Sequence, residues 1–259
     1  MTNTTAAKRC MADVLSMALL GLNAVFCQAA LATPASPNMT QTQTVSETLS
    51  ARQQAIVPIA AFAASGDISR LSAALNQGLD AGLTVSDAKE VLVQVYAYAG
   101  FPRSLNALGE LMKVLEARRQ RGIQDVAGRA PSRPIPTGEA LRAAGTANQT
   151  KLAGAPVQGP LFDFAPAIDE YLKTHLFGDI FERDNLDWQS RELATVGMLS
   201  ALPGAESQLQ SHMRISINVG LTAGQLDRLV QVLAERVGAD HARRASVALK
   251  QTLATSPKR

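Results

Sequence analysis

The stretch HMRISINVGLT at residues 212–222 has a near copy, ALNQGLDAGLT, at residues 74–84. Each stretch has the pattern of an amphipathic helix that ends at a glycine and of a second helix that begins at a threonine. Glycine readily adopts the left-handed conformation that ends helices. The threonine can cap the next helix, with Asp87 or Gln225 as its partner three residues further on. The sequence therefore predicts the same helical corner twice.

The similarity between the copies extends beyond this corner. Residues 49–84 and residues 186–222 share the order helix, glycine-containing turn, helix, Gly-Leu-Thr and helix, which indicates an internal duplication. Alanine and leucine dominate the chain, aromatic residues make up only 4%, and no alternating run of apolar and polar residues indicates a strand. We therefore expect an all-α fold of two tandem repeats.

Composition divides the chain into five parts. Two basic residues, an apolar run and an Ala-x-Ala site predict a cleaved signal peptide over residues 1–32, although a membrane anchor would show a similar apolar run. A segment rich in Thr, Ser, Pro and Gln predicts a flexible N-terminus, and frequent Gly and Pro predict a linker. The parts that follow the signal peptide are the flexible N-terminus at 33–48, the first repeat at 49–121, the linker at 122–164 and the second repeat at 165–253.

The predicted signal peptide bears on both chemistry and location. Both cysteines, Cys10 and Cys27, lie within it, so the mature protein would have no thiol for a disulfide, a metal site or a redox cycle. The remaining basic residues form no cluster typical of a nucleic-acid surface. We expect a periplasmic or secreted protein with no nucleic-acid partner and no stable membrane span after cleavage.

The two copies differ at His212, which is matched by Ala74. Glu192 and His212 lie on either side of the Pro-Gly turn at residues 203–204. Antiparallel helices, with a rise of ~1.5 Å per residue, would bring them to nearly the same height. If they face each other, the carboxylate orients the imidazole for general acid or base catalysis. Alternatively, Glu192 pairs with a nearby arginine or with solvent, and His212 is a half-buried polar residue.

The other two histidines are weaker candidates for a functional site. His175 is expected on a helix surface, and His241, which is followed by two arginines, is expected in solvent. The three histidines lack the i, i+4 spacing of a metal-binding helix, so no metal site is predicted. The chain also shows no glycine-rich phosphate loop after a strand and no Gly-x-Ser-x-Gly motif.

The stretch YAYAGFPRSLNAL at residues 96–108 is a second unusual feature. Gly-Phe-Pro at residues 100–102 interrupts a helical pattern, and the proline can occupy the first turn of a new helix. Tyr96 and Tyr98 would line whatever lies beside this break, or would fill an ordinary corner between helices. The matching place in the second copy, VGADHARRA, has no Tyr, Phe or Pro. The copies are thus complementary, as expected if the helix pair of one copy meets the corner of another.

These phrases resemble the motifs of a known family. R-E-L-A-T-V at residues 191–196, H-x-R-x-x-x-N-x-G-L-T at residues 212–222 and Y-A-G-F-P at residues 98–102 are similar to motifs of the carboxymuconolactone decarboxylase family, which includes alkylhydroperoxidase D. The resemblance covers both repeats. It implies an all-helical fold and a homo-oligomer, a trimer or a related assembly.

The resemblance also implies a chemistry. Members of the alkylhydroperoxidase D branch use a Cys-x-x-Cys pair, which the mature chain would lack, so peroxidase activity is a remote third interpretation. The decarboxylase branch uses neither cysteine nor a cofactor, and acts on a small carboxylated γ-lactone. We therefore expect a carboxy-lyase or isomerase, and the alternative is a non-catalytic oligomeric binding protein with the same fold.

Loss of CO₂ from such a lactone leaves a dienolate-like charge, which needs an electrostatic sink and a proton donor. By resemblance, His212 transfers the proton and Glu192 orients it. Gln94 stands where the decarboxylase branch usually has a second histidine. The residues that the resemblance implies for substrate binding are Arg214 or Arg191 for a carboxylate, and Tyr98 and Gln94 in the pocket.

Overall fold

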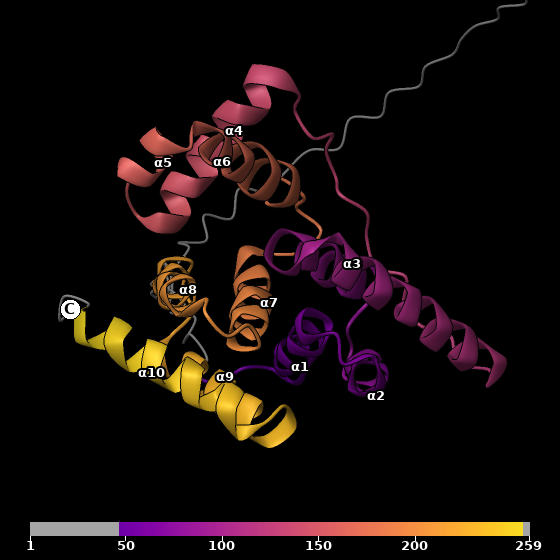
Figure 1. The fold of residues 1–259 in the computed structure, drawn as a ribbon. Coiled ribbons are helices and arrows are strands. Elements are labelled where there is room, and N and C mark those ends of the chain that lie inside the picture. The colour runs from indigo at the N-terminus through magenta and orange to yellow at the C-terminus, as the bar shows by residue number, and fades with distance from the viewer. Residues whose placement is uncertain (1–46, 256–259) are drawn as a thin grey trace, which may run out of the picture. The chain divides into compact units, whose positions relative to one another are not determined.

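The computed structural model describes residues 47–255, and all regular secondary structure in this range is helical (Figure 1). The expected all-α fold is thus confirmed. The predicted signal peptide, both cysteines and nearly all of the predicted flexible N-terminus lie outside the described residues. The helices are α1 (Ala51–Ser65), α2 (Ile68–Asp80), α3 (Val85–Gln120), α4 (Gly138–Ala153), α5 (Pro160–Phe164), α6 (Pro166–Tyr171), the π-helix η1 (Leu172–Ile180), α7 (Trp188–Ser200), α8 (Glu206–Asn218), α9 (Ala223–Arg236) and α10 (Ala239–Thr255).

The repeated corner forms as the sequence predicts. Gly82 and Gly220 both have positive φ angles, 92° and 96°. Thr84 and Thr222 each close a capping box with the residue three positions further on. These bonds satisfy backbone N–H groups that would otherwise lack a partner at the start of a helix. The same local sequence thus produces the same corner before α3 and before α9.

The equivalent first helices of the two repeats, α1 and α7, pack against each other in the core. Every residue from Ala55 to Ala64 is buried, as expected for a helix with neighbours on all sides. Gly197 permits the close approach, because a Cβ atom there would lie 2.8 Å from the carbonyl oxygen of Val57. In addition, α3 packs on α7 and α9 packs on α1. Each repeat thus places a helix against the first helix of the other repeat.

The predicted break in the long helix α3 is confirmed at Gly100, where φ is 82° and ψ is 162°. This conformation is open almost only to glycine, and Pro102 then occupies the first turn of the second half of the helix. The equivalent glycine of the second repeat, Gly238, has a φ of 150° and separates α9 from α10. Both repeats therefore bend at the same place.

The connection between the repeats is more ordered than its composition predicts. The sequence predicts a linker over residues 122–164, but this segment contains α4 and α5. α4 packs against η1, and a Cβ atom at Gly145 would lie 1.7 Å from the carbonyl oxygen of Lys173. The helix was not predicted because the Gly, Pro and Thr residues of the whole segment outweighed the helix-forming Ala, Leu, Glu and Lys residues of α4 itself.

Within residues 47–255, no helix is both long enough and apolar enough to cross a bilayer.

Candidate active site

Glu192 and His212 face each other across the antiparallel helices α7 and α8. His212 Nδ1 lies 2.8 Å from Glu192 Oε2, within hydrogen-bond distance. The Glu192 side chain is fully buried, and His212 is 8% exposed. Sequence spacing predicts only their height along the two helices, and the structure decides between pairing with each other and pairing elsewhere. The imidazole is paired with the carboxylate.

Tyr98 brings the corner of the first repeat to this pair. Its ring meets the His212 ring edge to face, with 5.6 Å between the ring centroids. Burial, and then the charge of Glu192, raise the pKa of the Tyr98 phenol. Its hydroxyl and Glu192 Oε1 are both buried without a hydrogen-bond partner among the described residues. Because buried polar atoms are usually paired, the hydroxyl and Oε1 retain unused hydrogen-bonding capacity next to His212.

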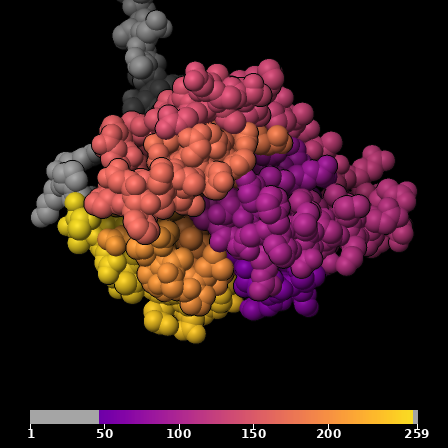
Figure 2. Space-filling model, turned by 45° about the horizontal axis from the view of Figure 1, so that its top comes forward, coloured from indigo at the N-terminus to yellow at the C-terminus, as the bar shows by residue number. Residues whose placement is uncertain are grey.

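A cavity of about 650 Å³ opens beside His212. Its lining comes from the first half of α3, from α4 and the segment up to α5, from η1, and from α7, α8 and the turn between them. In Figure 2 the pink and salmon surface of the connection lies next to the magenta and orange surfaces of the two repeats. The polar residues of the lining are Tyr98, Gln149, Gln208, Ser211, His212 and Arg214.

Arg214 supplies the positive charge of this cavity. It is exposed on α8, two residues after His212, and its guanidinium makes no ion pair within residues 47–255. A guanidinium can hold a carboxylate through two parallel hydrogen bonds. Its position is therefore consistent with the substrate-binding role that the family resemblance implies.

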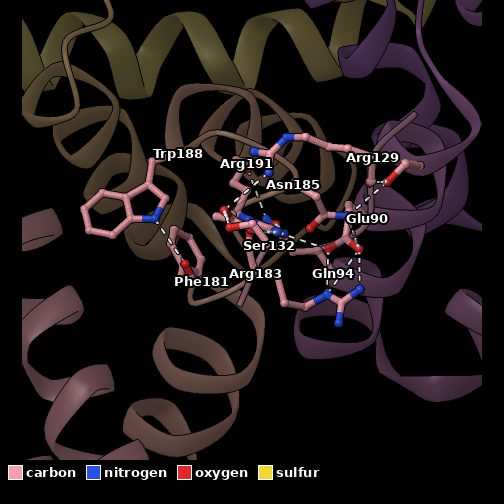
Figure 3. A network of polar contacts seen from close by, with 11 residues as sticks. Glu90, Gln94, Arg129, Ser132, Phe181, Arg183, Asn185, Trp188 and Arg191 are labelled. Atoms are coloured by element: carbon pink, nitrogen blue, oxygen red, sulfur yellow. Dashed lines mark hydrogen bonds and ion pairs between the residues drawn. The ribbon is translucent and has the colours of Figure 1, made fainter. Parts of the chain in front are cut away.

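Arg191 and Gln94 lie elsewhere, and their predicted contact with substrate needs correction. Arg191 is fully buried and its guanidinium donates to Glu90 Oε2 at 3.0 Å and to the Arg183 carbonyl oxygen at 2.8 Å (Figure 3). Gln94 is also fully buried and donates to the carbonyl oxygen of Arg191 at 3.0 Å and to Thr195 Oγ1 at 2.7 Å. Neither residue lines the cavity. Both are held within the interface between α3 and α7.

The network around Glu90 explains why Arg191 can be buried. Burial alone would raise the pKa of Glu90, but hydrogen bonds from Arg183 and Asn185 and the charge of Arg191 outweigh it and lower the pKa. Burial lowers the pKa of Arg191, and the Glu90 carboxylate opposes this shift. A buried charge needs such a partner. The network therefore joins α3 of the first repeat to α7 of the second.

The other histidines lie outside the cavity. His175 is exposed, as predicted, and its Nδ1 lies 2.9 Å from Asp179 Oδ2. The prediction for His241 is wrong, because this residue is half-buried and its Nδ1 is buried without a hydrogen-bond partner. Burial, together with Arg244, lowers the pKa of His241. Within residues 47–255, no group of three or more His, Cys, Asp or Glu side chains could hold a metal ion.

The residues that the connection contributes to the cavity were not predicted from the sequence. Gln149 on α4 is 4% exposed and lines the cavity, and Phe162 on α5 lines it as well. A signal was present in the sequence, since Leu141, Gly145, Gln149 and Leu152 recur at helical spacing and make one face of α4. The low apolar content of that face concealed it.

The fold and the site together define an all-α protein in which two helical repeats enclose one Glu–His pair. The chain belongs to the carboxymuconolactone decarboxylase family, whose model matches residues 35–112 and 166–251. These ranges cover most of each predicted repeat and leave out residues 113–165. The first match also begins earlier than the predicted start of the repeat at residue 49.

A curated relative supports this assignment. The chain is 31% identical over 70 residues to a 4-carboxymuconolactone decarboxylase of Acinetobacter baylyi (strain ATCC 33305 / BD413 / ADP1). The match covers 27% of this chain and 52% of the relative. The chain thus spans about half the length of the curated relative that it matches.

Proposed function

We propose that this protein is a cofactor-free carboxy-lyase or isomerase that acts on a small carboxylated, lactone-like substrate. The observation that carries the proposal is the 2.8 Å contact between His212 and a fully buried Glu192 at the edge of a cavity. An imidazole held by a carboxylate is a common device for moving a proton near neutral pH.

His212 is the proposed proton-transfer residue and Glu192 its orienting partner. With Nδ1 donating to Glu192, the neutral imidazole has Nε2 free to accept a proton from a substrate. The carboxylate then stabilises the imidazolium that forms. In an isomerisation, His212 removes a proton from one carbon of the lactone and returns it to another. In a decarboxylation, the C–C bond to CO₂ breaks, the electron pair moves into the lactone carbonyl, and protonated His212 donates a proton to carbon.

Tyr98 and Arg214 have complementary proposed roles. Tyr98 has a raised pKa and therefore stays a neutral phenol, which can donate a hydrogen bond to the oxygen where negative charge develops. Arg214 binds a carboxylate of the substrate and fixes its orientation. A Cys-x-x-Cys peroxidase mechanism is not supported, because the sequence has only Cys10 and Cys27.

The predicted location and assembly are also proposals. The sequence pattern of residues 1–32 supports export to the periplasm or beyond, and the family resemblance supports a homo-oligomer. N-terminal sequencing of the protein purified from the producing cells would test cleavage after residue 32. Light scattering coupled to size-exclusion chromatography would test the oligomer.

The catalytic proposal is tested with purified protein and 4-carboxymuconolactone, the compound in the relative's name. Release of CO₂ reports decarboxylation, and exchange of ring protons in D₂O, followed by NMR, reports proton transfer. His212→Ala should reduce either rate by roughly 10²- to 10⁴-fold, the range for loss of a general acid or base. His175→Ala, at an exposed histidine, should keep the rate.

The outcomes separate the site from the activity. Equal rates in His212→Ala and the unchanged protein would keep the activity and discard the proposed site. No release and no exchange with this compound would remove it as a substrate and favour the oligomeric binding protein. Glu192→Gln should leave a lower but measurable rate, since the imidazole remains but loses its charged partner.

A further inference from the structure

The connection between the repeats forms one wall of the cavity. Side chains from the end of α4, from the segment after it and from α5 line this wall, and they are Ala153, Ala155, Pro156, Val157 and Phe162. η1 continues the wall with Leu172, Leu176 and Phe177. Residues 113–165 lie outside the matched family ranges. The wall on this side is therefore apolar and is supplied largely by the part of the chain between the two family matches.

The charges of the cavity are few. Among its lining residues within the described part of the chain, Arg214 is the only Arg, Lys, Asp or Glu. Gln149 reaches the cavity from α4, is 4% exposed and makes no side-chain hydrogen bond within residues 47–255. Its amide can both donate and accept hydrogen bonds, so it can pair with an uncharged polar group of a ligand. The lining thus offers one site for an anion, an amide for an uncharged polar group, and an apolar surface.

The cavity is larger than a small carboxylated lactone. A carboxylated lactone of about 13 non-hydrogen atoms fills roughly 400 Å³, even at the ~30 Å³ that each water molecule occupies in the liquid. The cavity measures about 650 Å³. The cavity is open to solvent on one side, and the residues that line it are mostly apolar. A small, fully polar lactone would leave this surface uncovered.

We propose that the natural substrate is a carboxylated lactone with an apolar substituent. Arg214 holds one carboxylate, Gln149 pairs with an uncharged polar group of the substrate, and Phe162 packs against the apolar substituent. Phe162 and Gln149 are thus specificity-determining residues supplied by the connection. This inference rests on the proposed function, because it describes the substrate of the same site.

The test compares two compounds that differ only in the apolar group. One is a butenolide with an acetic acid side chain, and the other carries an additional hexyl group on the ring. Isothermal titration calorimetry measures their dissociation constants with the full chain, and needs no turnover. The hexyl compound should bind at least about tenfold more tightly, since burying each methylene removes apolar surface from water.

Variants of two phenylalanines on α5 test whether Phe162 produces the preference for the hexyl compound. Phe162→Ala should reduce the preference for the hexyl compound by about five- to tenfold. Phe164→Ala is the matched control, because Phe164 is 88% exposed and does not line the cavity. It should leave the preference unchanged within about twofold. Gln149→Ala should weaken binding of both compounds by about three- to tenfold, consistent with loss of one hydrogen bond.

Each result bears on the inference. Equal affinity for the two compounds, binding of neither, or equal effects of Phe162→Ala and Phe164→Ala would overturn it. Selective binding without CO₂ release or proton exchange would sustain the inference and contradict the proposed catalysis. Turnover of both compounds with equal affinity would sustain the proposed catalysis and contradict the inference about the apolar substituent.

Discussion

The two repeats share a backbone pattern but divide the chemistry between them. The second repeat places Glu192 and His212 where the first has Ala55 and Ala74, both of which are buried in the core. The first repeat keeps Tyr98 at its bend, where the second has Arg236. The helix pair of one repeat and the bend of the other meet within a single chain, at the 5.6 Å contact between Tyr98 and His212. A duplication can thus retain two equivalent folds while only one site keeps its polar groups.

The largest expected difference between the repeats concerns stability. Glu90 lies six residues after the capping threonine of the first repeat, and Arg228 has the equivalent place in the second. Glu90→Ala would leave Arg191 buried without its carboxylate, so it should destabilise the fold by about 3–5 kcal/mol. Arg228→Ala breaks a partly exposed pair with Glu235 and should cost about 1 kcal/mol or less. Urea unfolding of both variants measures the two values, and equal losses would contradict the asymmetry.

The next effect concerns the bend of the first repeat. Tyr98→Phe removes a buried hydroxyl that has no hydrogen-bond partner, so the melting temperature should stay the same or rise. If the hydroxyl stabilises developing charge, kcat should fall by roughly 10- to 100-fold. Tyr96→Phe is the control, since Tyr96 stacks on Phe101 and lies outside this cavity. A loss of kcat that is equal in both variants would remove the proposed role of Tyr98.

A smaller effect should be the same in both repeats. Gly82→Ala and Gly220→Ala each force an L-residue into a positive φ, which costs about 1–2 kcal/mol. Neither new Cβ meets backbone atoms within 3.4 Å, so the conformational cost should dominate. Denaturant midpoints of the two variants should therefore shift by similar amounts. A large difference between them would show that the corners are equivalent in geometry but not in energy.

The smallest expected effect is on the pH dependence of stability. The pKa of Glu90 lies below its ordinary value of 4.5 in the folded protein, so the unfolded chain binds this proton more tightly. Glu90 therefore contributes stability above the unfolded pKa, and this contribution is lost as the pH falls through the folded pKa. Glu90→Gln should flatten the fall in stability between about pH 5 and pH 3. An unchanged slope in a urea series would contradict the assigned shift.

Much of the fold was predictable because its signals are local. The glycine, leucine and threonine of each corner lie next to one another, and a capping box needs only the residue three positions on. The break at Gly100 was predictable for the same reason, since glycine and proline act on the adjoining backbone. In contrast, the packing of α4 was not predictable, because the contact between Gly145 and Lys173 joins residues that the sequence does not mark as neighbours.

The candidate site was also predictable only in part. Sequence spacing placed Glu192 and His212 at one height, and resemblance selected Tyr98 and Arg214 for the pocket. It also selected Arg191 and Gln94, which the structure buries against Glu90 and Thr195. The spacing of residues along a helix says which side chains share a face, but not which neighbouring helix covers that face.

The sequence by itself determined the helical repeats, their capped corners and the residue types available for chemistry, because these depend on short-range backbone preferences and on composition. Only the tertiary structure decided that His212 pairs with Glu192, that Arg191 is internal, and that Gln149 and Phe162 reach the cavity. Those outcomes depend on how α3, α4, α7 and α8 pack. Packing is set by the fit of side chains from distant parts of the chain, which no local pattern specifies.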